Sequence, residues 1–197
     1  MSFEFTEENL RKVKEIVARY PNTQAALLPV LHLAQEQVQA EGPEGYMSPE
    51  VLDHVAQVLD LPPVKVNQVA TFYTMYNKAP VGRYHVQVCT NVACHLTGGL
   101  QIFEHFKKKL GVGNHGTTDD GLFTLEEVEC LAACGTAPAL QINDRYDLDN
   151  PMRYYEQTAD NYDHVGDGQR RTSVEELIKW SDQIIDDLRK KPEGRRS

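Results

Sequence analysis

The sequence predicts a protein of mixed helices and strands, in which a helical bundle is followed by a small α/β layer. Apolar residues recur at helical spacing over residues 5–77, and the period changes to that of a strand after the segment 79–82. The four cysteines stand at or just beyond the ends of two predicted strands. We therefore expect a helical domain over 1–80, a second domain over 81–191 and a tail over 192–197.

The first two helices are bounded by cap residues and prolines. Thr6 is of a type that accepts a hydrogen bond from the first turn, and apolar residues follow at helical spacing until Pro21 ends the run. A second helix is expected from about Thr23 to Ala40. Because proline lacks the N–H that a helix interior uses, Pro29 is expected to kink this second helix.

Two more helices are expected before the linker. Ser48 caps the third, with Pro49 at its first position, and Pro62 and Pro63 break it. The fourth runs roughly from Val64 to Tyr76. Two helices joined by a short turn are also the outline of a DNA-reading motif, but this pair has more acidic than basic residues, which disfavours that interpretation.

The second domain begins with strand periodicity. Tyr84–Cys89 alternates as a strand that delivers Cys89 to its end, and a helix is expected from about Gly98 to Leu110, with Gly111 as its stop. Phe123–Glu129 reads as a second strand that also ends at a cysteine pair. Such sheets hold their ligands at the carboxyl ends of strands, so both cysteine loops are expected there.

The remainder of the chain is less regular. Residues 139–146 predict a hairpin with its turn at Asp144 and Arg145, and the polar, aperiodic stretch 147–172 is interpreted as an inserted loop. A capping box, Ser173–Glu176, opens a final helix. The residues of that helix expected to face inward are Leu177, Ile178, Ile184, Ile185 and Leu188.

The cysteines form two tight pairs. Cys89 and Cys94 are spaced C-x4-C, thirty-five residues intervene, and Cys130 and Cys134 are spaced C-x3-C. Two small loops that each present two sulfurs are what a metal site of four thiolates needs. These four side chains are therefore the candidate metal ligands.

Four interpretations of the pairs stay open. A disulfide framework is disfavoured because no export signal is visible, and unrelated buried cysteines rarely segregate into pairs. Structural zinc accepts four cysteines, usually with two to four residues between ligands. A [2Fe–2S] cluster accepts wider and unequal loops, and the small residues that flank both pairs let backbone N–H groups approach the sulfurs. The pattern favours the cluster.

Other catalytic chemistry finds no support in the sequence. His95 follows Cys94 directly and is interpreted as a loop histidine, and the remaining histidines form no cluster at ligand spacing. No catalytic residues are assigned, because no Ser-His-Asp or Cys-His-Asn constellation and no glycine-rich phosphate loop can be argued. The chain is expected to lack a complete active site of its own.

Composition limits the partners. The chain of 197 residues carries 29 acidic and 20 basic residues, for a formal charge of −9, and none of the parts 1–80, 81–147 and 148–197 is basic. A nucleic-acid surface is therefore not expected. The longest apolar stretch, 25–34, is too short to span a bilayer. The expected location is the cytoplasm, with any membrane association through other subunits.

A sequence signature surrounds the second pair. Asp120, Phe123 and Thr124 precede Cys130 in the pattern D-x2-F-S/T-x5-C, and the continuation C-L-G-x-C-x2-G/A-P is met up to Pro138. One position departs from it, because Ala132 stands where the pattern has glycine. With this signature the chain resembles, over roughly residues 10–147 and the last helix, the thioredoxin-like [2Fe–2S] subunit of respiratory complex I. Bacterial members of that family are called the E subunit, and mitochondrial members the 24 kDa flavoprotein subunit.

The resemblance implies a thioredoxin-like fold for the second domain and one [2Fe–2S] cluster. Cys89 and Cys94 then ligate one iron, and Cys130 and Cys134 the other. It also implies a partner flavoprotein that binds NADH and FMN and on which the helical domain packs, together with further peripheral-arm subunits. The complex is expected on the cytoplasmic side of the bacterial inner membrane. Equivalent subunits of NAD-linked hydrogenases or formate dehydrogenases, and a zinc-binding adaptor, are the alternatives.

Overall fold

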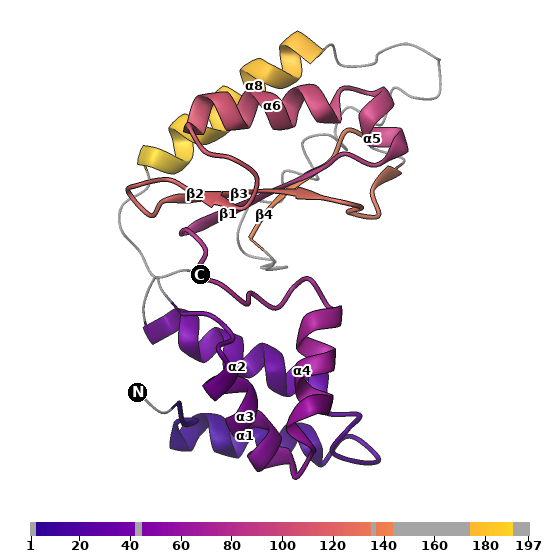
Figure 1. Ribbon diagram of the computed structural model, residues 1–197, viewed down its shortest axis with the longest axis vertical. Helices are drawn as coiled ribbons and strands as arrows, with labels where there is room; N and C mark the ends of the chain where they lie inside the picture. Colours follow the sequence, from indigo (N-terminus) through magenta and orange to yellow (C-terminus); the bar gives the residue numbers. More distant parts are fainter. Residues whose placement is uncertain (1–2, 42–44, 135–136, 144–173, 191–197) are drawn as a thin grey trace. The chain divides into compact units, whose positions relative to one another are not determined.

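The computed structural model describes residues 3–41, 45–134, 137–143 and 174–190. It divides into two compact units, one up to Val81 and one from Gly82 onward, and each has its own apolar core. The first unit contains helices, and the second contains a small mixed sheet with helices against it (Figure 1). The predicted class of mixed helices and strands is confirmed. None of the described helices has the length and apolar character needed to cross a membrane.

Helices α1 to α4 make up the first unit. Their bounds are Glu7–Val17 for α1, Leu27–Glu41 for α2, Pro49–Leu59 for α3 and Pro63–Phe72 for α4. Both expected caps are confirmed: the Thr6 hydroxyl accepts from the backbone N–H of Asn9 at 3.2 Å, and the Ser48 hydroxyl accepts from that of Val51 at 3.5 Å. The caps satisfy N–H groups that have no partner within their helices.

The expected kink at Pro29 is wrong. Helix α2 begins at Leu27, so Pro29 lies in its first turn, where a missing N–H costs nothing. The preceding residues form a separate turn in which Ala26 donates to the carbonyl of Thr23. The side-chain oxygen of Asn22 accepts a hydrogen bond from the N–H of Ala25 at 2.9 Å, and this contact supports that turn.

The fourth helix is shorter than predicted. It ends at Phe72, and Tyr73 has extended backbone angles. The following turn places Tyr76 in the core, 1% exposed, where its hydroxyl donates to the carbonyl of Leu28 at 2.9 Å. Burial raises the pKa of Tyr76. Gln35 holds the same turn, because its amide contacts the carbonyl of Met75 and the backbone N–H of Asn77.

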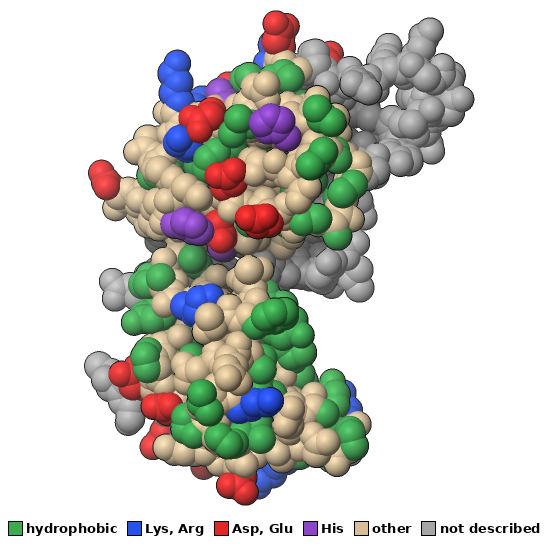
Figure 2. Space-filling view, turned by 45° about the vertical axis from the view of Figure 1, so that its right-hand side comes forward, with side chains coloured by type: hydrophobic (Ala, Val, Ile, Leu, Met, Phe, Trp, Pro, Cys, Tyr) green, Lys and Arg blue, Asp and Glu red, His purple; other side chains and the backbone are tan. Residues whose placement is uncertain are grey.

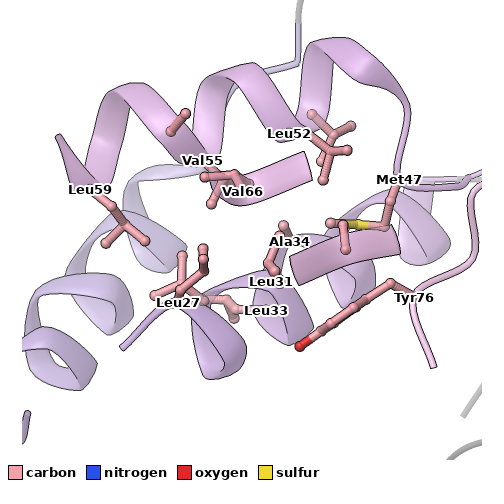
Figure 3. Packing of buried hydrophobic residues seen from close by; sticks show 14 of the residues in the cluster. Leu27, Leu31, Leu33, Ala34, Met47, Leu52, Val55, Leu59, Val66 and Tyr76 are labelled. Carbon is pink, nitrogen blue, oxygen red and sulfur yellow. The ribbon is translucent and has the colours of Figure 1, made fainter. Parts of the chain in front are cut away.

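The core of this unit lies between α2, α3 and α4 (Figure 3). Leu31 and Ala34 of α2 meet Val55 of α3 and Val66 of α4, and all four side chains are fully buried. Helix α1 adds Val13 to the same cluster. Side chains from four helices therefore close one apolar interior, which gives this unit its stability.

The second unit alternates strands and helices (Figure 1). The bounds are Tyr84–Cys89 for β1, Val92–Leu96 for α5, Gly99–Leu110 for α6, Gly116–Thr117 for β2, Phe123–Val128 for β3, Leu140–Ile142 for β4 and Val174–Lys190 for α8. The predicted strands at 84–89 and 123–129, and the helix that Gly111 ends, are confirmed. Helix α5 and strand β2 were not predicted.

The sheet has the order β2-β3-β1-β4. Strands β1 and β3 are parallel, with Tyr84 opposite Phe123 and Cys89 opposite Val128, whereas β4 and β2 pair antiparallel to β1 and β3. Because β1 and β3 are parallel neighbours, their carboxyl ends meet at one edge of the sheet. The first cysteine pair begins there with Cys89, the last residue of β1, and the second pair follows β3.

The two faces of the sheet differ. On one face Val86, Val88 and Leu125 pack with apolar residues of α6 and α8 into a single core. The other face presents polar side chains, and the carboxylate of Glu126 accepts from His85 at 2.7 Å and from Gln87 at 3.0 Å. This carboxylate thereby joins the two strands that lead to the cysteine pairs.

Several expectations fall partly or wholly outside the described residues. These are the hairpin turn at 144–145 with Tyr146, the inserted loop 147–172, the cap at Ser173 and the tail 192–197. The described arm of the hairpin is β4, which pairs with β1. In α8, Leu177, Ile184, Ile185 and Leu188 are buried as predicted, while Ile178 is half-buried.

Replacing Tyr76 by phenylalanine tests the turn after α4. Tyr76→Phe removes the hydroxyl that donates to the buried carbonyl of Leu28, and we expect the free energy of unfolding to fall by about 1 kcal/mol. Urea denaturation followed by circular dichroism measures it. Tyr73→Phe, in the same segment but 37% exposed, is the control and should change stability by less than about 0.5 kcal/mol. Equal stability of Tyr76→Phe and the unaltered chain would contradict the assigned hydrogen bond.

Candidate metal centre

The four cysteines lie at or just beyond the carboxyl ends of two neighbouring strands of the sheet. Cys89 is the last residue of β1 and Cys94 lies in α5, while Cys130 and Cys134 follow β3. All four thiols are free, and the first two are buried whereas the last two are exposed. The predicted placement of both loops at the carboxyl ends of strands is therefore seen in the structure.

The sulfurs interact across the loops. Cys89 and Cys134 both lie close enough to Cys94 to raise the pKa of its thiol, Cys89 chiefly through a hydrogen bond. Cys89 and Cys94 form a small apolar cluster with Ala139, against which Leu131 and Ala133 of the second loop pack. The structure thus brings the first pair and the second loop into contact, with Cys130 at the start of that loop.

Hydrogen bonds tie the residues after Cys89 to those before Cys130. The hydroxyl of Thr90 donates to the carboxylate of Glu127 at 2.7 Å. The side-chain amide of Asn91 donates to the backbone carbonyl of Glu129, also at 2.7 Å, while its oxygen caps α5 by accepting from the N–H of Val92. These contacts hold the two cysteine loops at a fixed separation.

Ala139 contacts both cysteines of the first pair through its backbone. Its carbonyl accepts from the backbone N–H of Cys89 at 3.0 Å, and its own N–H donates to the sulfur of Cys94. A second N–H to sulfur contact joins Ala132 to Cys130 at 3.2 Å. Backbone donors of this kind stabilise negative charge on thiolates.

Ala132 has a left-handed backbone, with φ of 55°. It occupies the position at which the signature has glycine, and glycine adopts this conformation without the clash that a Cβ atom brings. The loop between Cys130 and Cys134 therefore carries local strain in this chain, at the residue whose N–H contacts the Cys130 sulfur.

Gly99, the first residue of α6, is required by close packing against the first cysteine loop. A Cβ atom there would lie 2.6 Å from the carbonyl oxygen of Cys89 and 2.8 Å from that of Cys94. Both neighbours are backbone atoms, which cannot move aside without displacing the cysteines. Gly99 thus allows α6 to approach the site.

The donor set fits a metal centre of thiolates. As a free thiol, Cys94 has its pKa raised to about 11, first by burial and then by its hydrogen bond with Cys89. Buried thiolates need a nearby positive charge, which bound iron or zinc supplies. Within the described ranges, no three or more His, Cys, Asp or Glu side chains are close enough together to hold one metal ion.

The fold and the site define a small α/β domain with four cysteines at the ends of two parallel strands. Residues 13–162 match the family of thioredoxin-like [2Fe–2S] ferredoxins. The chain belongs to that family.

Several curated relatives share one name. The E subunit of NADH-quinone oxidoreductase from Rickettsia conorii is 45% identical over 147 residues, which cover 74% of this chain and 85% of the relative. Its counterpart from Rickettsia felis is 41% identical over 163 residues, or 82% of this chain and 95% of the relative. The counterpart from Mycobacterium bovis is 47% identical over 130 residues, which cover 66% of this chain and 49% of the relative.

Among solved structures, the chain is similar to an NAD⁺-reducing [NiFe]-hydrogenase in the air-oxidized state. The identity is 24% and the TM-score 0.48 over 60% of this chain, and the chain spans 19% of the length of that hydrogenase chain.

The sequence did not identify the residues that support the cysteines. Asn91 was detectable, because asparagine directly before a short apolar run is a preferred cap, and the Gly98–Gly99 pair marked a close approach. The contact of Thr90 with Glu127 depends on the pairing of two strands and left no local signal. His95 is exposed, in agreement with its interpretation as a loop residue.

Ala132→Gly should relieve the strain beside Cys130. We expect the variant to be more stable by about 1 kcal/mol, because the left-handed conformation costs alanine about that amount. Thermal denaturation measures the change, and Ala133→Gly in the same loop is the control that should not stabilise. A destabilised Ala132→Gly variant would show that the loop gains nothing from glycine at this position.

The carboxylate of Glu126 gives the second unit an acid-sensitive link. Its pKa is lowered, chiefly by the hydrogen bond from His85. A lowered folded pKa stabilises the fold above the unfolded pKa, and that stability is lost as pH falls through the folded value. We expect the unaltered chain to lose stability below about pH 4.5 more steeply than Glu126→Gln. Urea titrations from pH 3 to 7 measure the free energy of unfolding of both chains. Glu104→Gln, at an exposed position, is the control. Parallel dependence of this free energy on pH in Glu126→Gln and the unaltered chain would refute the link.

Proposed function

We propose that Cys89, Cys94, Cys130 and Cys134 hold one [2Fe–2S] cluster and that the chain is a one-electron relay subunit of an NADH:quinone oxidoreductase. The first pair binds one iron and the second pair the other. The observation that carries the proposal is the placement of one cysteine pair at the carboxyl end of each of the parallel neighbours β1 and β3. Membership of a [2Fe–2S] family and relatives named as an NADH-quinone oxidoreductase subunit support it.

The chain contributes ligands, backbone dipoles and shielding. When bound, the cluster supplies one-electron chemistry, because one iron passes between the ferric and ferrous states. The N–H groups of Ala132 and Ala139 lie where they stabilise thiolate charge. Buried Cys89 and Cys94 keep one side of the site from water, whereas exposed Cys130 and Cys134 leave the other side near the surface.

The catalytic machinery for NADH lies on a partner in this proposal. A flavoprotein subunit binds NADH and FMN, takes up the two electrons of the hydride and passes them singly to neighbouring centres. The helical first unit packs on that flavoprotein, and further peripheral-arm subunits join the complex on the cytoplasmic side of the bacterial inner membrane. The relatives are named as one subunit of an NADH-quinone oxidoreductase, which supports the presence of partner subunits.

Metal and sulfide analysis of the purified chain tests the proposal. We expect two irons and two acid-labile sulfides per chain, and a reduced sample with the electron paramagnetic resonance (EPR) signal of a [2Fe–2S] centre. Cys130→Ser should lose most of this iron and sulfide, because a thiolate ligand is gone. His95→Asn, next to Cys94, is the control and should keep both.

Two outcomes would contradict it. Stoichiometric zinc without sulfide would make the chain a zinc-stabilised adaptor, and full iron and sulfide in Cys130→Ser would refute the ligand assignment. Subunits that co-purify with the chain distinguish a quinone-reducing complex from an NAD-linked hydrogenase or formate dehydrogenase.

A further inference from the structure

A carboxylate outside the ligand set lies beside the cysteine site. Glu127 is in β3, where it pairs with Val88, the residue before Cys89. With strands about 4.8 Å apart and a rise of about 3.3 Å per residue, the Cα atoms of Glu127 and Cys89 are separated by about 6 Å. Figure 2 shows acidic side chains on the visible face of the second unit, so nearness to the site, and not acidity alone, distinguishes Glu127.

Hydrogen bonds hold Glu127 through both its backbone and its side chain. Its backbone N–H donates to the side-chain oxygen of Asn114 at 2.8 Å. Its carboxylate accepts from the hydroxyl of Thr90 at 2.7 Å, and Thr90 directly follows Cys89. A hydrogen bond to a charged acceptor is stronger than one between neutral groups. The carboxylate is therefore kept near the first cysteine loop although the Glu127 side chain is exposed.

The charge of this carboxylate is not balanced by a nearby cation among the residues that the structure describes. The neighbouring Glu126 pairs with His85, but none of the ion pairs in the described ranges includes Glu127. Thr90 is neutral, so its hydrogen bond orients the carboxylate and leaves the negative charge in place. Glu127 thus adds a negative charge close to four thiols.

Such a charge opposes the uptake of an electron at the site. A [2Fe–2S] cluster on four thiolates carries a charge of about −2 when oxidised and about −3 when reduced, and net charge is one of the factors that set its potential. For a unit charge at about 10 Å and an effective dielectric constant of about 40, Coulomb's law changes the ratio of reduced to oxidised cluster by about fourfold.

We propose that Thr90 is a positioning residue for Glu127 and that the carboxylate placed in this way lowers the reduction potential of the cluster. The inference rests on the proposed function and names a residue pair that sets how readily the cluster accepts an electron. Without the hydroxyl of Thr90, the Glu127 side chain turns into solvent, where water and salt screen its charge. Loss of either residue leaves all four thiolate ligands in place.

Removing the charge of Glu127 tests the electrostatic step. Glu127→Gln keeps a side-chain oxygen that can accept from Thr90. The full chain with its cluster is titrated against redox mediators at pH 7, and EPR measures the reduced cluster. At the midpoint potential of the unaltered chain, we expect a ratio of reduced to oxidised cluster about fourfold higher in the variant. At 59 mV for a factor of ten, the midpoint potential rises by about 35 mV.

Salt and two Thr90 variants test the positioning. The rise in Glu127→Gln should shrink between about 0.02 M and about 0.5 M salt, because salt screens surface charges. Thr90→Val lacks the hydroxyl and should raise the potential by a smaller amount, whereas Thr90→Ser keeps the hydroxyl and should have the unaltered potential. The double variant of Thr90→Val and Glu127→Gln should match Glu127→Gln alone, because the hydroxyl acts through the carboxylate. A further rise in the double variant overturns the positioning role of Thr90.

Asp186→Asn is the matched control. It removes the same charge from an exposed side chain of α8. Asp186 is three residues from Arg189, which lies over the ring of Phe123 at the start of β3, the end of that strand away from the cysteines. We expect an unchanged potential in this variant. Equal rises in Asp186→Asn and Glu127→Gln would assign the effect to net charge and overturn the proposal.

The EPR signal separates failure of this inference from failure of the proposed function. An unaltered chain without the signal of a [2Fe–2S] centre after reduction overturns the proposed function and this inference with it. The same signal and the same midpoint potential in the unaltered chain and Glu127→Gln overturn the inference alone. If Thr90→Val loses the cluster, Glu127→Gln and Thr90→Ser still decide, because each keeps the groups that form the hydrogen bond.

Discussion

The parallel pairing of β1 with β3 is the constraint on which the site depends. Cys89 lies opposite Val128 in this pairing, so two loops far apart in the sequence begin at the same edge of one sheet. If β1 shifted its register by one residue, Val86 and its neighbours on that strand would turn out of the core. The apolar core between the sheet and helices α6 and α8 therefore determines not only stability but also where the two cysteine loops begin.

Polar contacts further fix the positions of the two strands and of the cysteine loops that follow them. Glu126 links the strands on their polar face, and Thr90 and Asn91 link the loops beyond them. Ordering a flexible loop costs conformational entropy. Because these contacts already order the two cysteine loops, the entropy cost of metal binding by the four thiols is lower. The strained backbone at Ala132 is the exception, since this residue places an N–H on the Cys130 sulfur in a conformation that glycine adopts more readily.

The sequence predicted the elements whose signals are local. Cap residues Thr6 and Ser48, the alternation in β1 and the stop at Gly111 all correspond to structure. Errors arose where tertiary packing decides. The sequence predicts Pro29 inside a helix because the apolar spacing continues before Leu27. It also predicts that α4 reaches Tyr76, whose burial in the core reflects a turn and not a helix. The contacts of Thr90 with Glu127 and of Asn91 with Glu129 connect residues distant in sequence, so no local pattern could predict them.

The central claim is that the two cysteine pairs surround two bridged irons. X-ray absorption at the iron edge of the purified full chain tests this most directly, because it reports both the ligand atoms and a neighbouring metal. The account predicts a first shell of sulfur alone and a second iron close by. Nitrogen or oxygen ligands, an isolated iron without a metal neighbour, or a signal found only at the zinc edge would contradict it.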